Sequence, residues 1–383
     1  MPSDLHFMRL ALRLARRGFG RTSPNPMVGA VLVRDGAVIG QGWHRRAGQA
    51  HAEIEALRDA QRRGSSGRGA RGATLYVTLE PCSTHGRTPP CTDAIIAAGI
   101  RRVVAAGPDP NPAHCGRGFA ILQRAGIEVS AGLLAGEAAK LNEAFHHWIV
   151  HRTPLVTVKA AMSLDGRIAT TAGESRWITG EKARALGMRL RAGADAILVG
   201  VKTVLADDPS LSVRLPGFKD KRWVRIILDP RARTPLTAKV VSDHQAASTI
   251  VVVTKAAPAW RAAALGRRVR VLRAPALADG INLRWLLEKL GREEVTSLLV
   301  EGGGETNDAF LAGGLAGRVA FFYAPLALGG RGAPRAVAGE GVARVSQAPV
   351  LRQVRWRRLG QDLLLTARVP EAARKKEYVY RHR

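Results

Sequence analysis

The chain has 383 residues, of which 46% are hydrophobic and 23% are charged, and its formal net charge is +28. This length favours two domains, each large enough to bury a core of its own. The ordinary charged fraction argues against wholesale disorder, and no apolar run approaches the ~18 residues that cross a bilayer. Arginines interrupt the first twenty positions, where a signal peptide needs an unbroken apolar stretch. We therefore expect a cytoplasmic protein without a membrane partner.

The positive charge is spread along the whole chain, from Arg9 to Arg383, and most of it comes from arginine. Such scattering in a chain rich in alanine and glycine favours a compositional habit over a dedicated nucleic-acid surface. A positive surface would still attract phosphorylated small molecules. We expect no nucleic-acid partner, and a homo-oligomer is compatible with the sequence.

Residues 1–146 show helical and strand patterns in alternation, which is typical of a layered α/β domain. In chain order, we expect a helix over 5–17, a strand pair over 28–43 around the Asp35-Gly36 turn, a helix over 52–63, a surface loop over 63–72, a strand within 73–82, a helix over 92–99, a strand from 101 with a Pro-rich loop to 111, and a helix over 119–126.

A second α/β domain is expected over 154–370, after a hinge at 146–154 and before a basic, frayed tail at 371–383. Its apolar strand segments, in chain order, are 155–162, 192–200, 222–230, 247–254, 267–274, 295–304 and 317–330.

A histidine, a glutamate and two cysteines form the strongest motif of the chain. His51 and Glu53 lie at the start of one expected helix, and Cys82 and Cys91 precede another. A catalytic zinc takes three protein ligands, keeps a fourth position for water and lowers the pKa of that water to about 7. One imidazole and two thiolates meet this need, and Glu53 is then placed to move protons.

The spacing of the cysteines departs from the pattern H-x-E…P-C-x-x-C of zinc nucleobase deaminases, because eight residues separate Cys82 from Cys91. The alternative interpretation is a fortuitous tripeptide with idle thiols, which the combination of motifs disfavours. Three cysteines are also too few for a disulfide framework. Other histidines and the third cysteine are expected to be structural or exposed: His85, Cys115, His146, His147 and His151.

The second domain contains a strand followed by three glycines and a helix, at 300–310, but no G-x-G-x-x-G fingerprint. Glycines and a helix N-terminus suit a phosphate. An ordinary turn has the same pattern, so this segment alone leaves both interpretations open.

Several segments together resemble the bifunctional deaminase/reductase family of riboflavin biosynthesis, over residues 5 to 368. They are PNPMVG at 24–29, the HAE tripeptide, LEPCSTHGRTPPCTDAIIAAG, DPNP at 109–112, VKAAMSLDGRIA, GESRWITG, LRAGADAILVG and TVLADDPSLSVR. The resemblance implies an N-terminal cytidine-deaminase-like three-layer α/β/α domain and a C-terminal dihydrofolate-reductase-like α/β domain that uses NADPH.

The resemblance also implies roles for single residues. In the first domain, His51, Cys82 and Cys91 would hold Zn²⁺, Glu53 would shuttle protons, Asn25 would bind the pyrimidine, and the loop at 86–90 would shape the pocket. In the second domain, the residues implied to contact the substrate are Ser175, Arg191, Leu211, Arg214 and Glu301. Those implied to contact the cofactor are Ala161, Trp177, Thr203, Asp207, Gly303, Gly304, Glu305, Thr306 and Asn307.

Physical chemistry supports part of this assignment, because Arg191 and Arg214 can each bind a phosphate through two N–H groups. Lys159 is a further candidate, either to polarise the opened sugar or as a charge anchored at a strand end. Glu305 and Asp308 make the glycine turn more acidic than a site for a cofactor phosphate would prefer. The expected preference for NADPH over NADH is therefore implied by the resemblance and not by these residues.

The expected function is two consecutive steps on a phosphorylated pyrimidine. The first is hydrolytic deamination of 2,5-diamino-6-(5-phosphoribosylamino)pyrimidin-4(3H)-one, and the second is NADPH-dependent reduction of the ribosyl group of 5-amino-6-(5-phosphoribosylamino)uracil. Two alternatives remain at this point. One is a tRNA-type base deaminase with a C-terminal binding domain, and the other is a chain in which one half has lost its chemistry.

Overall fold

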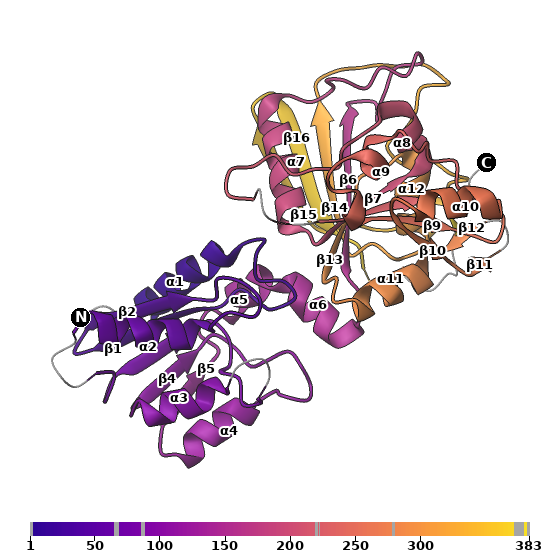
Figure 1. Cartoon of the computed structure of the whole chain (residues 1–383). Coiled ribbons are helices and arrows are strands. Elements are labelled where there is room, and N and C mark those ends of the chain that lie inside the picture. Colours follow the sequence, from indigo (N-terminus) through magenta and orange to yellow (C-terminus); the bar gives the residue numbers. More distant parts are fainter. Residues whose placement is uncertain are drawn as a thin grey trace. The chain divides into compact units, whose positions relative to one another are not determined.

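The computed structural model describes residues 3–64, 69–85, 89–218, 221, 223–277, 280–370 and 379–380. They form two compact units, Met1–Arg152 and Thr153–Arg383, which are drawn in Figure 1 and described one at a time below. Three expected segments lie partly outside the described residues: the surface loop at 63–72, the pocket loop at 86–90 and the tail at 371–383.

The first unit alternates helices with the strands of one five-stranded sheet. Its elements are α1 (Asp4–Ala15) with a 3₁₀ turn (Arg16–Gly18), β1 (Gly29–Arg34), β2 (Ala37–Trp43), α2 (Ala52–Arg62), β3 (Thr74–Val77), α3 (Cys91–Ala97), β4 (Arg102–Ala105), α4 (Arg117–Arg124), β5 (Glu128–Ala131), α5 (Ala135–Leu141) and α6 (Glu143–His151). The strand order is β2-β1-β3-β4-β5. Strand β1 is antiparallel to both of its neighbours, and β3, β4 and β5 are parallel.

Alternate residues of β1 point to opposite faces of this sheet, as the two-residue period of a strand requires. Ala30 and Leu32 pack with residues of α2 and α3, whereas Val31 and Val33 pack with α1. Helices therefore cover both faces, and the predicted three-layer α/β/α architecture is confirmed.

The second unit is built on a mixed nine-stranded sheet, β10-β9-β8-β7-β13-β6-β14-β16-β15. Its strands are β6 (Leu155–Ser163), β7 (Ala196–Gly200), β8 (Val224–Leu228), β9 (Thr249–Val253), β10 (Arg270–Arg273), β13 (Ser297–Val300), β14 (Arg318–Ala324), β15 (Arg352–Leu359) and β16 (Asp362–Arg368). A small separate sheet contains β11 (Ala276–Leu277), β12 (Gly280–Asn282) and β17 (Val379–Tyr380).

Helices cover both faces of the large sheet. They are α7 (Glu181–Gly193), α8 (Val201–Asp207), α9 (Lys239–Ser242), α10 (Ala259–Gly266), α11 (Leu283–Arg292) and α12 (Gly304–Ala312), and short 3₁₀ turns lie at Ala246–Ser248 and Val345–Gln347. Residues of α11 and α12 pack on one face, residues of α8, α9 and α10 pack on the other, and α7 packs across β6, β14 and β16 (Figure 1). The predicted α/β fold of this half is confirmed.

Two features differ from the sequence-based expectations. The hinge expected at 146–154 begins inside α6, and Arg152, with φ of +56°, ends that helix. The hairpin of β15 and β16 was not predicted, because β15 is exposed at nearly every position and its only apolar alternation, Val354 and Trp356, is short and set among arginines. In the part of the chain that the structure describes, we find no helix with the length and apolar character needed to cross a membrane.

Candidate active sites

A cavity of about 230 Å³ in the first unit contains most of the residues predicted for the metal site. Its lining includes Asn25, His51, Glu53 and Cys82. Cys91, which is fully buried, lies beside it and contacts both His51 and Cys82.

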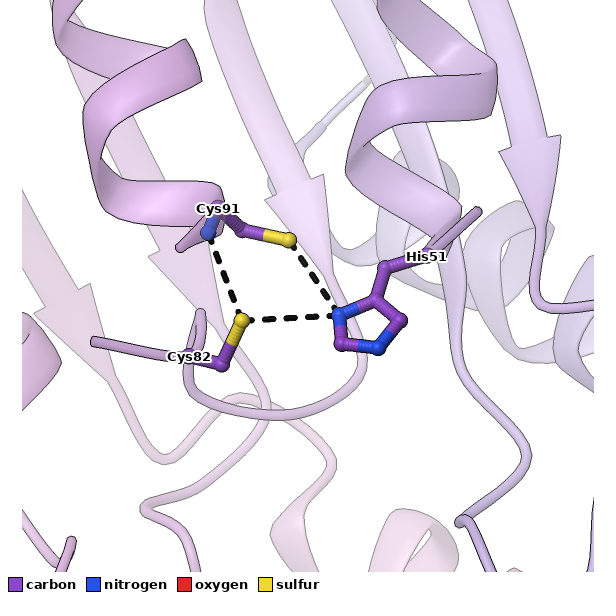
Figure 2. Close-up of side chains that lie close together, drawn as sticks. All are labelled: His51, Cys82 and Cys91. Carbon is purple, nitrogen blue, oxygen red and sulfur yellow. Dashed lines mark hydrogen bonds between the residues drawn. The ribbon is translucent and has the colours of Figure 1, made fainter. Parts of the chain in front are cut away.

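Two helix starts and one loop bring the three metal-site residues together. His51 is the N-cap of α2 and Cys91 is the first residue of α3, whereas Cys82 lies in the loop that follows β3. Figure 2 shows the imidazole directed at the two sulfur atoms. Helix α2 can lie this close to β2 because Gly42 has no side chain, and a Cβ there would stand 2.5 Å from the carbonyl oxygen of Ala52.

The donor atoms have the separations that one tetrahedral ion requires. Nδ1 of His51 lies 3.4 Å from Sγ of Cys82 and 3.3 Å from Sγ of Cys91, and all three atoms lie within 4.8 Å of one another. With zinc bonds of about 2.0 Å to nitrogen and 2.3 Å to sulfur, tetrahedral geometry places nitrogen and sulfur about 3.5 Å apart. The residues therefore fit a zinc ion with one position left open.

Electrostatics distinguish the two cysteines. The hydrogen bond from the Cys91 thiol, together with those from His51 and the Cys91 backbone N–H, lowers the pKa of Cys82 to about 4. The same thiolate raises the pKa of Cys91. Burial raises the pKa of Glu53 to about 7, which is a suitable range for a group that takes and returns a proton.

His44, which the sequence analysis did not single out, fixes the orientation of Asn25. Nδ1 of His44 lies 3.1 Å from the carbonyl oxygen of Ala50, and Nε2 lies 3.2 Å from Nδ2 of Asn25. A carbonyl only accepts, so Nδ1 carries the hydrogen and Nε2 accepts from the amide of Asn25. The amide oxygen of Asn25 is then the atom left to accept a hydrogen bond from a ligand in the cavity.

Glu80 is a second functional residue that sequence reasoning missed. Its buried carboxylate accepts hydrogen bonds from the backbone N–H groups of Asp109, Gly116 and Gly118, at 2.8 to 2.9 Å. It thereby holds the loop that brings Asp109, Asn111 and His114 to the cavity. The only available signal was the position of Glu80 beside the Pro-Cys motif. His85 and Cys115 are exposed.

A cavity of about 310 Å³ in the second unit brings together six of the residues predicted for the reductase. They are Lys159, Ala161, Trp177, Arg191, Arg214 and Glu301. Arg184, which was not predicted, also lines the cavity and lies over the Trp177 ring. Four cationic side chains against one carboxylate make this cavity suitable for a phosphorylated ligand.

Arg191 and Glu301, which both line this cavity, form a two-point ion pair with N···O distances of 2.7 and 2.5 Å. Burial alone would raise the pKa of Glu301, but Arg191 and Lys159 outweigh it and bring that pKa to about 2. Burial lowers the pKa of Lys159, and Arg191 lowers it further. The cavity therefore holds a firmly ionised carboxylate beside an ammonium group that gives up its proton more readily than usual.

The glycine turn after β13, which the resemblance assigns to the cofactor, leads directly into α12. Gly303 donates its N–H to Oγ1 of Thr203 at 3.0 Å, and the helix that begins at Gly304 leaves its first N–H groups without intrahelical acceptors. The buried Asn307 donates to the Ala336 carbonyl oxygen, and its Oδ1 has no hydrogen-bond partner among the described residues. Glu305 is paired with Lys202 at 2.9 Å, so part of the acidity of this turn is neutralised.

The remaining predicted residues lie outside the lining of the second cavity. Asp207 accepts a hydrogen bond from Ser175 at 3.0 Å, and Leu211 is buried in the hydrophobic cluster beneath the loop after α8. Thr306 is buried in α12. The Ser175–Asp207 hydrogen bond connects the loop before α7 to the end of α8.

Comparison with known families divides the chain in the same way. Residues 1–107 match the family described as the cytidine and deoxycytidylate deaminase zinc-binding region. Residues 154–365 match the RibD C-terminal domain.

Relatives of similar length match nearly the whole chain. The riboflavin biosynthesis protein RibD of Aquifex aeolicus is 43% identical over 94% of this chain and 97% of its own length, and that of Escherichia coli is 40% identical over 94% and 98%. Among solved structures, Acinetobacter baumannii RibD superposes with a TM-score of 0.84 at 39% identity, covering 96% of this chain and 99% of that one. A diaminohydroxyphosphoribosylaminopyrimidine deaminase/5-amino-6-(5-phosphoribosylamino)uracil reductase from Thermotoga maritima gives 0.82 at 36% identity, with the same coverage.

Proposed function

Because the chain belongs to the RibD family of riboflavin biosynthesis proteins, which combine a zinc-dependent deaminase with an NADPH-dependent reductase, we propose that its two cavities carry out these two steps in turn. The substrates would be those of the expectation above, the diaminopyrimidinone ribosyl phosphate and then the aminouracil ribosyl phosphate. The family match over nearly the full length of both domains favours this small pyrimidine over a tRNA base.

The first step takes place in the cavity of the first unit. When bound by His51, Cys82 and Cys91, zinc supplies a water that is acidic enough to attack at neutral pH. Asn25 accepts a hydrogen bond from the pyrimidine and orients its 2-amino carbon. Glu53 takes one proton from the attacking water to the adjacent ring nitrogen, and then the remaining hydroxyl proton to the amino group, so that ammonia leaves and a carbonyl remains.

The second step takes place in the cavity of the second unit, where NADPH supplies a hydride. Reduction adds this hydride at the anomeric carbon and a proton at the ring oxygen of the sugar, which opens the ribose to a ribityl chain. Arg214 binds the phosphate, and the Arg191–Glu301 pair orients the sugar hydroxyls. Lys159 is the group we place at the ring oxygen, where its Nζ donates the proton.

The observation that carries the proposal is that the first cavity holds Glu53 beside a cluster of three metal-ligating residues, and that the second gathers four cationic side chains around one carboxylate. We also propose that the protein is located in the cytoplasm. The metal site needs two reduced thiols, and the cytoplasm keeps thiols reduced. The domain boundaries proposed for the two activities are 1–146 and 154–370.

The proposal is tested by measuring ammonia release and NADPH oxidation by one preparation of the full chain. Glu53→Gln is expected to keep its zinc and to release ammonia at least about 100-fold more slowly. It should oxidise NADPH normally when given the aminouracil ribosyl phosphate. Glu55→Gln, in the same helical turn but paired with Arg45 and Arg58, is the matched control. Wild-type ammonia release by Glu53→Gln, or none from the zinc-loaded wild type, would contradict the proposal.

A further inference from the structure

Arg225 is an arginine that is buried completely inside the second unit, at 0% exposure. All five of its N–H groups donate hydrogen bonds. They reach Oγ1 of Thr249, the carbonyl oxygens of Ser210 and Val240, and both carboxylate oxygens of Asp243, at 2.7 to 3.1 Å. No other side chain could satisfy five acceptors from this position, because lysine has only three donors.

The bond to Ser210 connects this buried cluster to the loop that follows α8. Within that loop, Leu211 has φ of +49° and is inserted into the hydrophobic cluster below. The Ser210 and Ser212 hydroxyl groups lie 2.9 Å apart, and Arg191 donates to the Ser212 carbonyl oxygen at 3.0 Å. The loop is thus held on one side of Leu211 by Arg225 and on the other by Arg191.

Two residues beyond Ser212, Arg214 reaches the cavity of the second unit. Among the described residues, the structure shows no hydrogen bond or ion pair of its guanidinium group, in contrast to Arg191 and Arg225. An arginine without a protein partner on a loop held at two points is suited to a phosphate, since its backbone is fixed while its donors are available.

We propose that Arg225, anchored by Asp243, is a positioning residue for the reductase, which fixes the Ser210–Ser212 backbone so that Arg214 meets the phosphate of the substrate. This inference rests on the proposed function, because it takes Arg214 as the phosphate ligand. A buried ion pair is weak support for stability, and apolar residues of similar volume often stabilise a core more. What an apolar residue cannot do is hold the Ser210 carbonyl oxygen in place.

The test uses the full chain with Arg225→Lys and Asp243→Asn, which keep side chains of similar size in the core. For each variant we would measure the thermal stability, kcat, the KM for the aminouracil ribosyl phosphate, the KM for NADPH, and the Ki of inorganic phosphate as a competitive inhibitor. Ammonia release by the first unit of the same molecules reports the amount of intact protein. The matched control is Arg270→Lys on β10, which alters the two-point ion pair between Arg270 and Glu293.

We expect the KM for the substrate and the Ki of phosphate to rise together by about 10- to 100-fold, the effect of a misplacement of about 1 Å. The value of kcat and the KM for NADPH should stay within about twofold, because the lost interaction is made equally in the ground and transition states. In an Arg214→Ala background, Arg225→Lys should add almost nothing to the KM.

Three results would overturn the inference, and they are distinguishable. If Arg214→Ala raises the KM and Arg225→Lys does not, the positioning role is wrong and the substrate site stands. If kcat, NADPH affinity and thermal stability all fall together in both variants, Arg225 is only a structural residue. If Arg214→Ala itself leaves the KM unchanged, the proposed phosphate site fails, and the inference fails with it.

Discussion

Replacing Glu301 with glutamine should destabilise the second unit strongly at neutral pH, because it removes the partner of a buried arginine while leaving the shape of the side chain unchanged. The Glu301 side chain is 7% exposed and that of Arg191 is 17% exposed. Lys159 also lies in the same cavity. In the variant, two cationic groups would face each other without a carboxylate between them.

The size of the effect follows from the pKa of Glu301. A pKa of about 2 instead of the usual 4.5 corresponds to about 3 kcal/mol of stabilisation of the charged form in the folded chain. This agrees with the range of about 3–5 kcal/mol for removing one partner of a buried ion pair.

The lowered pKa of Glu301 also makes the stability of the second unit depend on pH. The pKa of Glu301 is lower in the folded than in the unfolded chain, so its contribution is complete above pH 4.5 and is lost as the pH falls toward 2. The difference in stability between the wild type and Glu301→Gln should therefore be largest at neutral pH and shrink steadily below pH 4.5.

Urea unfolding, monitored by tryptophan fluorescence, would measure the difference in unfolding free energy between the wild type and Glu301→Gln. Of the seven tryptophans, the five in the second unit are Trp177, Trp223, Trp260, Trp285 and Trp356. Glu305→Gln, which alters the exposed pair with Lys202, is the control and should cost less than about 1 kcal/mol. A Glu301→Gln variant within about 0.5 kcal/mol of the wild type at pH 7 would refute the reasoning, as would a full-sized difference that persists at pH 3.

Three further predictions concern the first unit. Removing zinc with a chelator should abolish ammonia release, while the rate of NADPH oxidation with the aminouracil ribosyl phosphate stays within about twofold of that of the untreated protein. The metal content is measured alongside. Parallel loss of both activities would contradict separate sites. Gly42→Ala should lower the stability of the first unit by about 1–3 kcal/mol, because its Cβ would meet the backbone of α2, whereas Gly107→Ala, with nothing within 4 Å, should not. In Glu80→Gln, an amide NH₂ replaces one carboxylate oxygen that accepts hydrogen bonds from backbone N–H groups of the loop. The KM of deamination should therefore rise several-fold at nearly constant zinc content. An unchanged KM would show that the loop does not depend on this carboxylate.

The metal site could be predicted from the sequence because its residues lie at element boundaries. His51 precedes a helix and Cys91 begins one, so local patterns locate both side chains. Their meeting with Cys82 follows from the packing of α2 and α3 on the same face of the sheet. The second cavity was predicted only through the resemblance, since its residues come from β6, α7, β14 and distant loops.

What the sequence did not reveal depends on tertiary structure. Arg225 is one of many arginines and lies in an apolar strand, so nothing local marks it as the centre of a five-bond cluster. Glu80 accepts hydrogen bonds from N–H groups that are 29 to 38 residues further along the chain. The β15–β16 hairpin lacks the alternating pattern of a half-buried strand, because β15 is an exposed edge strand.

The position of β13 in the large sheet has a consequence for how the protein is made. Its residue Ser297 pairs with Leu155, and Leu298 pairs with Ala196, so the central strand is synthesised long after both of its neighbours. During translation, β6 and β7 therefore wait with unpaired edges that invite association between nascent chains. We expect ribosome-bound chains that end before Ser297 to be protease-sensitive throughout the second unit, and protection to arise only after β13, and then β14 on the other edge of β6, have left the exit tunnel.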